Sequence, residues 1–261
     1  MKGLKGYLNR REEAILLLLA KPAPVCTPAT FHQLRVEIKK LRALFELINH
    51  CAPSFKQSKN FKPFRVLFRQ AGKVREIQVE EGLLKKYFTG NTLQVYRNSL
   101  KQLRLKERHQ YFSLRTEELI AQLRKNFHVL RAFLPKVTKK KLNVYLEKQR
   151  KEIIVKLRSK KLPQAELHEL RKRLKTFTYN SRLSSAGKQT ETFFTKIRLT
   201  ALLGQWHDDQ LMLLNFQKAI RSHYTNQAEV KRLKKVKARI LAHSRALLKQ
   251  VRTAIQKEVL G

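Results

Sequence analysis

A regular row of basic side chains and one histidine lies in residues 31–48. Its members are His32, Arg35, Lys39 and Arg42. On a helix with about 100° per residue, offsets of three, seven and ten residues stay within about a quarter of the circumference. Guanidinium and ammonium groups bind phosphate oxygens, and a protonated imidazole donates from both nitrogens. The row therefore has the chemistry of an anion-binding site, although a solvated basic helix face would show the same spacing.

An apolar stripe occupies the opposite side of the same segment. It consists of Leu34, Ile38, Leu41 and Phe45. The two stripes predict an amphipathic helix that buries one face and presents the basic row on the other. A Pro-rich break at residues 21–28 precedes it, so Thr27 or Thr30 is expected to cap the helix, with Pro28 in its first turn. The helix is expected to end near His50.

The pattern returns in the second part of the chain. His168, Arg171 and Lys175 repeat the first three offsets, and the apolar residues at 170, 174 and 177 keep the register of those at 34, 38 and 41. A glycine-containing segment follows each copy at a similar distance, with Gly72 in the first and Gly204 in the second. An internal duplication is the simplest explanation. Gly72 indicates either a close approach to the backbone or a kink, and both readings stay open.

With these motifs the chain resembles the CHAD family, the conserved histidine α-helical domain. The first-helix pattern H-x-x-R-x-x-x-K-x-x-R fits the row that begins at His32, and L-G-x-x-[RN]-D is approximated twice. The two approximations are Gly72, Arg75 and Glu76, and Leu203, Gly204, His207 and Asp208. Three positions depart from the pattern: Thr178 corresponds to Arg42, Glu76 replaces Asp, and His207 replaces Arg or Asn. The resemblance covers about residues 28–260 and implies an all-α protein that binds inorganic polyphosphate.

The predicted architecture is all-α, with two helical-bundle halves from an internal duplication packed about a pseudo-two-fold axis. We expect one CHAD-like domain over residues 1–261, halves at about 28–134 and 142–260, and an N-terminal docking helix with a linker at 1–27. Within the first half, the periodicity predicts a turn at residues 51–59, a helix at 61–88 and one long helix from about residue 93 to 134. In the second half, helices are expected at 142–160, 163–184, 190–220 and 227–259.

Composition favours a polyanionic partner. The chain has 58 Lys and Arg against 19 Asp and Glu, a formal net charge of +39, and 42% hydrophobic residues. Such a basic, folded chain fits nucleic acid, polyphosphate or an anionic membrane surface. The apolar run at residues 14–20 is too short to span a bilayer and reads as part of a docking helix or of a signal peptide. Cys26 and Cys51 imply no disulfide framework, which fits a reducing cytoplasm.

Catalytic signatures are absent from the sequence. It contains no G-x-x-x-x-G-K-[ST] phosphate loop, no G-x-S-x-G, and no E-x-E-x-K of the triphosphate tunnel domain that often accompanies the family. Carboxylates are few, and only Asp208 and Asp209 are adjacent. A metal ion at His32 and His168 would be repelled by the cations three and seven residues on. We therefore expect no enzyme activity, no cofactor and no metal.

The sequence thus predicts non-catalytic polyphosphate binding in a basic groove or channel between the halves, as the resemblance implies. The expected ligands of polyphosphate are His32, Arg35, Lys39, Lys40, Arg42, Arg65, Arg69, Arg75, His168, Arg171, Lys175, Arg198 and His207. The alternative is a nonspecific nucleic-acid or ribosome-associated protein, which would use the same charges. A third reading is a scaffold that reaches polyphosphate granules through the same site. Cytoplasmic localisation is expected in each case, and the oligomeric state is left open.

Overall fold

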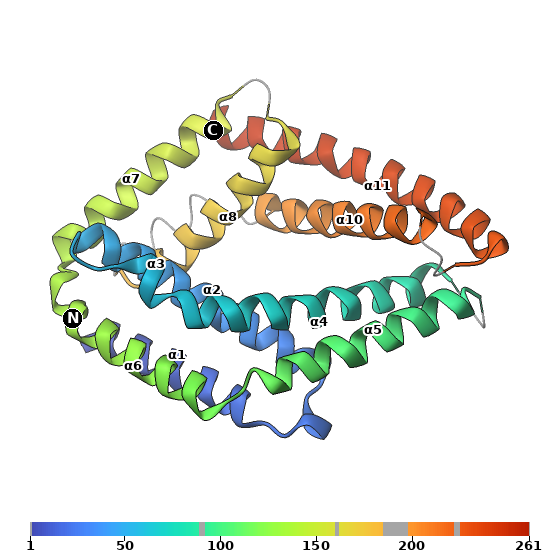
Figure 1. Ribbon diagram of the computed structural model, residues 1–261. Coiled ribbons are helices and arrows are strands. Elements are labelled where there is room, and N and C mark those ends of the chain that lie inside the picture. The colour runs from blue at the N-terminus through green and yellow to red at the C-terminus, as the bar shows by residue number, and fades with distance from the viewer. Residues whose placement is uncertain (1, 89–91, 160–161, 185–197, 222–224, 261) are drawn as a thin grey trace. The chain divides into compact units, whose positions relative to one another are not determined.

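A computed structural model describes residues 2–88, 92–159, 162–184, 198–221 and 225–260 (Figure 1). Over these ranges the chain forms α-helices, two short 3-10 helices and no strand, which confirms the all-α prediction. The elements are α1 (Lys2–Ala20), η1 (Ala23–Val25), α2 (Pro28–Cys51), α3 (Gln57–Asn60), α4 (Lys62–Tyr87), α5 (Gln94–Ser113), α6 (Glu117–Phe133), η2 (Leu134–Lys136), α7 (Lys139–Leu157), α8 (Gln164–Ser181), α10 (Arg198–Arg221) and α11 (Gln227–Leu260). No helix in these ranges combines the length and apolar character needed to cross a membrane.

The chain packs into two compact units. Unit 1 contains Met1–Gln78, Arg104–Arg150 and Thr176–Glu191, and unit 2 contains Val79–Leu103, Lys151–Lys175 and Thr192–Gly261. Each unit draws on both predicted halves, and α4, α5, α7 and α8 each have residues in both units. The units follow packing rather than sequence repeat, so the duplication and the boundaries of the halves stay predictions.

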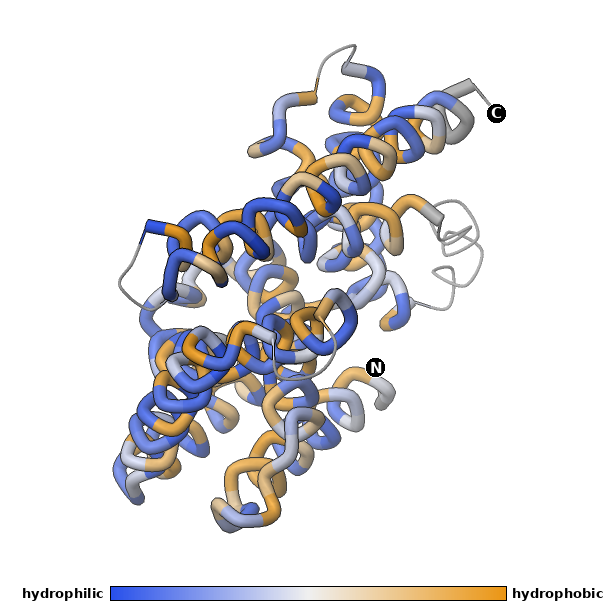
Figure 2. Tube along the Cα trace, turned by 90° about the vertical axis from the view of Figure 1, so that its right-hand side faces the viewer, coloured by the Kyte–Doolittle hydropathy of each residue, from blue (hydrophilic) through white to orange (hydrophobic). Residues whose placement is uncertain are grey.

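The core of unit 1 forms around the apolar face of α2. The four residues of the predicted stripe, Leu34, Ile38, Leu41 and Phe45, are all fully buried. The Phe45 ring lies 5.1 Å from Phe61 and 5.8 Å from Phe64, and Phe64 in turn lies 5.2 Å from Phe127 of α6. Figure 2 shows hydrophobic and hydrophilic residues interspersed along the helices, as expected where one face is buried.

The start of α2 agrees with the sequence. Thr27 is the N-cap and Pro28 follows at the first helical position. The backbone N–H of Thr27 donates to Oγ1 of Thr30 at 3.2 Å. This reciprocal Thr27–Thr30 arrangement satisfies N–H groups that have no partner within a helix, so it fixes where the basic row begins.

The predicted single helix at about 93–134 is wrong, because the chain breaks there into α5 and α6. Thr116 lies at the break as N-cap of α6, and its side chain accepts a hydrogen bond from the backbone N–H of Leu119 at 3.2 Å. Glu117 and Glu118 occupy the first turn, where negative charge is favourable. This cap and acidic turn are an N-terminal signal that the basic periodicity obscured.

Unit 2 contains the hairpin of α10 and α11, which pack side by side (Figure 1). Gln210 donates to Oγ of Ser244 at 2.7 Å, and Nδ1 of His243 lies 2.7 Å from Oδ2 of Asp209. Of the helix predicted at 190–220, residues 190–197 lie outside the described part of the chain.

Buried carboxylates connect other elements of unit 2. Glu229 of α11 accepts hydrogen bonds from the backbone N–H groups of Val95 and Tyr96 at 2.8 and 3.2 Å. These N–H groups belong to the first turn of α5, so Glu229 caps a helix more than 100 residues away in sequence. Glu80 of α4 accepts from the Tyr96 hydroxyl and, at 2.8 Å, from Nδ2 of Asn215.

Candidate polyanion-binding site

Arg35 is held against the backbone of α4. Its Nη1 donates to the carbonyl oxygen of Phe68 at 2.9 Å, and its guanidinium carbon lies 4.2 Å from the centre of the Phe68 ring. This approach requires Gly72, because a Cβ there would overlap with Nη1 and lie 3.2 Å from Cζ of Arg35. Of the two readings left open for Gly72, the structure supports a close approach, made by an arginine side chain.

Two further cations of α2 lie close to the Phe68 ring. The guanidinium carbon of Arg42 lies 4.9 Å from the Phe68 ring centre, and Nζ of Lys39 lies 5.9 Å from it. Arg42 is also 4.9 Å from the ring of Phe61. Aromatic faces attract cations, so these rings hold the basic groups without neutralising them.

Burial and neighbouring charges shift the pKa values of the same residues. Burial is the main cause that lowers the pKa of the Arg35 guanidinium from its ordinary value. Arg42 and Arg75 lower that pKa further, whereas Glu76 raises it. The shift thus reflects chiefly the removal of the guanidinium from water, with the nearby charges of Arg42 and Arg75 adding to it.

The pKa of Arg42 shows the same effect. Burial again contributes most to its lowering, and Glu46 opposes it. The charges of Arg65 and Arg69 of α4 lower the pKa further. Five predicted arginines of unit 1 therefore interact electrostatically, and we call them the arginine cluster: Arg35, Arg42, Arg65, Arg69 and Arg75. An anion placed among them would relieve their repulsion.

Two other predicted residues of unit 1 lie differently. His32 is exposed on the first turns of α2. Lys40 donates to Oε1 of Glu37 at 2.8 Å, and Glu37 also pairs with Arg11 at 2.8 Å. A ligand would have to compete with this acidic partner for Lys40.

Replacing Gly72 by Ala is expected to weaken polyphosphate binding about tenfold while changing the free energy of unfolding by no more than about 1 kcal/mol. Alanine favours a helix over glycine by about 1 kcal/mol, which offsets the lost Arg35 hydrogen bond of similar size. Gly82→Ala is the matched control in the same helix, since nothing lies within 4 Å of a Cβ there. Equal affinities of the two variants, measured by calorimetric titration, would show that the position of Arg35 does not matter for binding.

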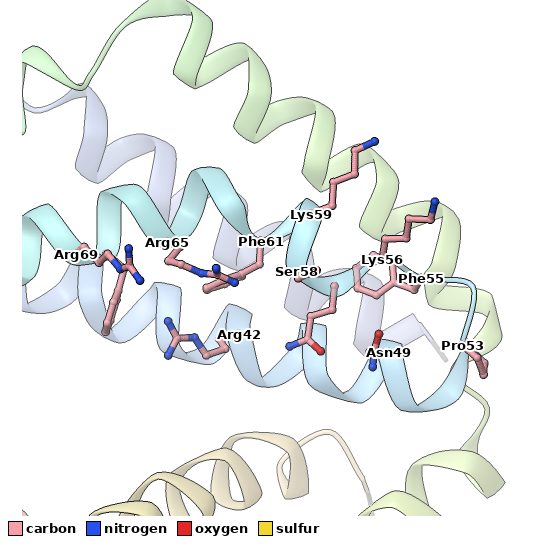
Figure 3. A pocket seen from close by; sticks show the side chains of 12 residues that line it. Arg42, Asn49, Pro53, Phe55, Lys56, Ser58, Lys59, Phe61, Arg65 and Arg69 are labelled. Carbon is pink, nitrogen blue, oxygen red and sulfur yellow. The ribbon is translucent and has the colours of Figure 1, made fainter.

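A pocket of about 880 Å³ adjoins the arginine cluster (Figure 3). Arg42 of α2 and Arg65 and Arg69 of α4 line one part of it, and Figure 3 shows the Arg42 side chain pointing toward α4. Lys56 and Lys59 also line it, and the sequence interpretation missed both. They lie at and within α3, a helix of four residues in the stretch predicted as a turn, which is too short to show any periodicity.

In unit 2 the structure brings two predicted histidines together. The rings of His168 on α8 and His207 on α10 have centres 4.6 Å apart. Burial lowers the pKa of His168, and the charges of Lys172 and Arg171 lower it further. Glu169 opposes this shift.

Lys175 lies on α8, two helical turns after His168. Burial lowers its pKa, Arg171 lowers it further, and Asp208 of α10 raises it. Both motif copies therefore have carboxylates near their cations, Asp208 in the second copy and Glu76 and Glu46 in the first. Arg198 is the first residue of α10, and its side chain lies outside the described part.

Comparison with known proteins decides the family. The family model of the CHAD domain matches residues 16–213. The chain belongs to the CHAD domain family. It is also similar to the crystal structure of the CHAD domain from the plant Ricinus communis, with a TM-score of 0.69 and 16% sequence identity over 96% of this chain and 86% of that chain. A search of curated proteins finds no match.

The two motif copies of this CHAD domain are built differently. In the first copy, every basic position from Arg35 to Arg42 lies in unit 1. In the second, the residues from His168 to Lys175 lie in unit 2, whereas Thr178 lies in unit 1. Among the described residues of this CHAD domain, no group of three or more His, Cys, Asp or Glu side chains could hold a metal ion.

Proposed function

We propose that this CHAD domain binds inorganic polyphosphate and does not catalyse its conversion. The observation that carries the proposal is the arginine cluster, in which burial and mutual repulsion lower the pKa values of Arg35 and Arg42. Holding like charges together costs free energy unless a counter-charge is bound, so the cluster is suited to a dense anion. Arginine also offers paired N–H donors that match phosphate oxygens.

The geometry of α2 supports a linear anion. His32 and Arg42 are ten residues apart on one helix face, which corresponds to about 15 Å at about 1.5 Å per residue. Basic side chains of α4 accompany this row over its last part through Arg65 and Arg69. A chain of closely spaced phosphates can contact such a row at several points, whereas a single phosphate can use only one or two of its members.

A competition experiment tests the proposal. Labelled long-chain polyphosphate is bound at physiological salt and challenged with duplex DNA, single-stranded RNA and tripolyphosphate at equal phosphate concentration. We expect the affinity for long-chain polyphosphate to exceed that for each competitor by tenfold or more. The double variant His32→Ala/His168→Ala is expected to reduce this difference in affinity. Equal competition by every polyanion, unaffected by the histidine changes, would favour a nonspecific nucleic-acid-binding protein instead.

We further propose that one long chain engages basic residues of both motif copies. Arg35→Ala and Arg171→Ala are expected each to lower the affinity for long-chain polyphosphate at constant stoichiometry, and their losses are expected to multiply in the double variant. Calorimetry measures both quantities. A fall in stoichiometry with unchanged affinity would mean that the copies bind separate chains.

Affinity for polyphosphate is expected to rise as pH falls. His168 has a pKa below its ordinary 6.5 in the free protein, so its imidazole is neutral at pH 7. A bound polyanion favours the charged form and raises that pKa. The added affinity is fully present below the pKa of the free protein and is lost as pH rises through the pKa of the complex.

Titrations between about pH 5.5 and 8 measure this dependence. His168→Gln is expected to flatten the profile, with circular dichroism at each pH as a control for folding. This control matters because a depressed histidine pKa also favours unfolding at low pH. An unchanged slope in His168→Gln would exclude His168 as the titrating group.

A further inference from the structure

The pocket beside the arginine cluster has two chemically different ends. Arg42, Arg65 and Arg69 form a cationic end. Asn49 of α2 with Gln57 and Ser58 of α3 line the other part and carry neutral donors and acceptors. None of the described residues that line the pocket is acidic.

The separation between the ends is set by α2. Arg42 and Asn49 are seven residues apart, so they lie on the same face about 10 Å apart along the axis. Figure 3 shows both on the side of α2 that faces α3 and α4. The pocket therefore runs along α2 from a charged to an uncharged region.

The two lysines of the pocket do not remove this asymmetry. Lys56 and Lys59 are exposed, and Figure 3 shows their side chains extending from α3 away from α2. Their ammonium groups thus lie on the side opposite Asn49. Of the lining residues on α2, only Arg42, at the cationic end, carries a charge.

Every unit of inorganic polyphosphate is charged, so that chain has no uncharged part to place beside Asn49, Gln57 and Ser58. A phosphate ester fits better, since its phosphates and its organic group are separate. The pocket volume of about 880 Å³ also lies within the usual range for small-molecule sites of about 300–1,000 Å³. We propose that this pocket binds a phosphate ester of the nucleoside triphosphate class, with phosphates at the arginines and the organic group at Asn49, Gln57 and Ser58.

This site does not require polyphosphate binding, but it shares three arginines with the proposed polyphosphate site. A nucleotide in the pocket would occupy Arg42, Arg65 and Arg69. It would therefore compete with long-chain polyphosphate for unit 1. Only this competition depends on the proposed polyphosphate function.

Calorimetric titration of the full chain with ATP and with tripolyphosphate, without divalent cations, tests the proposal. ATP carries no more charge than tripolyphosphate, so charge alone gives it no advantage. We expect ATP to bind at least fivefold more tightly. GTP and CTP as further ligands show whether the base or only the sugar is recognised.

The variant Asn49→Ala/Gln57→Ala is expected to lower the affinity for ATP about tenfold. Its affinity for tripolyphosphate is expected to stay within twofold of that of the parent chain. Gln102→Ala/Gln122→Ala, which removes two exposed amides on α5 and α6, is the control. Arg42→Gln is expected to lower the affinity for both ATP and tripolyphosphate. Thermal unfolding of each variant checks that it is folded.

Two results would overturn the inference: tripolyphosphate binding as tightly as ATP, or an equal loss for both ligands in the amide variant. Long-chain polyphosphate in the same titrations separates the two proposals. If it binds and ATP does not, only the nucleotide site fails. If ATP binds and polyphosphate does not, only the polyphosphate function fails.

Discussion

Replacing Arg42 and Arg65 together by Gln is expected to weaken the binding of long-chain polyphosphate by about a hundredfold. Each arginine can make charge-assisted hydrogen bonds to phosphate worth about 1.5–3 kcal/mol, and two such losses correspond to at least this factor. The effect is expected to be large because Arg42 is the member of the α2 row that interacts with the cations Arg65 and Arg69 of α4. Measurement at a fixed physiological salt concentration keeps the electrostatic background constant.

The matched control for this variant is Lys106→Gln/Lys125→Gln, which removes the same charge from exposed positions of unit 1. It is expected to change affinity by less than threefold. The arginine variant is expected to stay folded, because the relieved repulsion among Arg42, Arg65 and Arg69 offsets the lost attraction between Arg42 and Glu46. Equal losses of affinity in both variants would mean that only the net charge of the protein matters.

Glu229→Ala is expected to lower the free energy of unfolding by about 3 kcal/mol. Its carboxylate is 5% exposed and accepts from the backbone N–H groups of Val95 and Tyr96, which have no partners within α5. Removing a charged acceptor from these donors costs about 1–3 kcal/mol for each donor left unsatisfied, and most at the buried N–H of Tyr96. Urea denaturation measures the loss, and hydrogen exchange is expected to speed up most in the first turn of α5.

Glu229→Gln provides the control, because its amide keeps one acceptor oxygen without the charge. An intermediate loss of stability is expected. A loss below about 0.5 kcal/mol in Glu229→Ala would show that water replaces the carboxylate, in which case this contact does not stabilise α5.

The face of α2 was predictable because one helix carries both signals. The 3.6-residue period separates Leu34 and Ile38 from Arg35 and Lys39, and burial follows that division. The capping Thr27 is equally local. Patterns within a few residues of each other therefore sufficed for the helix and for the basic row that it presents.

Contacts between distant segments were not predictable in this way. Gly72 could be read as a kink or as a close approach, and only the position of Arg35, 37 residues earlier, distinguishes these readings. Nothing in the sequence indicates that Glu229 caps α5, since a lone acidic residue in a basic helix is usually an exposed surface residue. The pairing of His168 with His207 likewise depends on how α8 and α10 pack.

Sequence reasoning also failed where an element was too short. Pro53 and Ser54 correctly indicated a turn, but α3 within that stretch has only four residues and no apolar stripe. Gln57 and Lys59 therefore looked like loop residues without a role. Polar residues of a loop beside a basic helix are the signal that would have drawn attention to them.

The interleaving of the two units has a consequence for dividing the molecule. A cut at residues 135–141 would cross only the short η2 and the start of α7, yet it would leave neither fragment with a complete unit. The N-terminal piece would keep Glu80 and Tyr96 without Asn215 and Glu229. The missing partners would all be on the other piece. The two fragments should thus behave like the parts of a split protein, each incomplete when made alone and able to recover the native contacts only on reassociation.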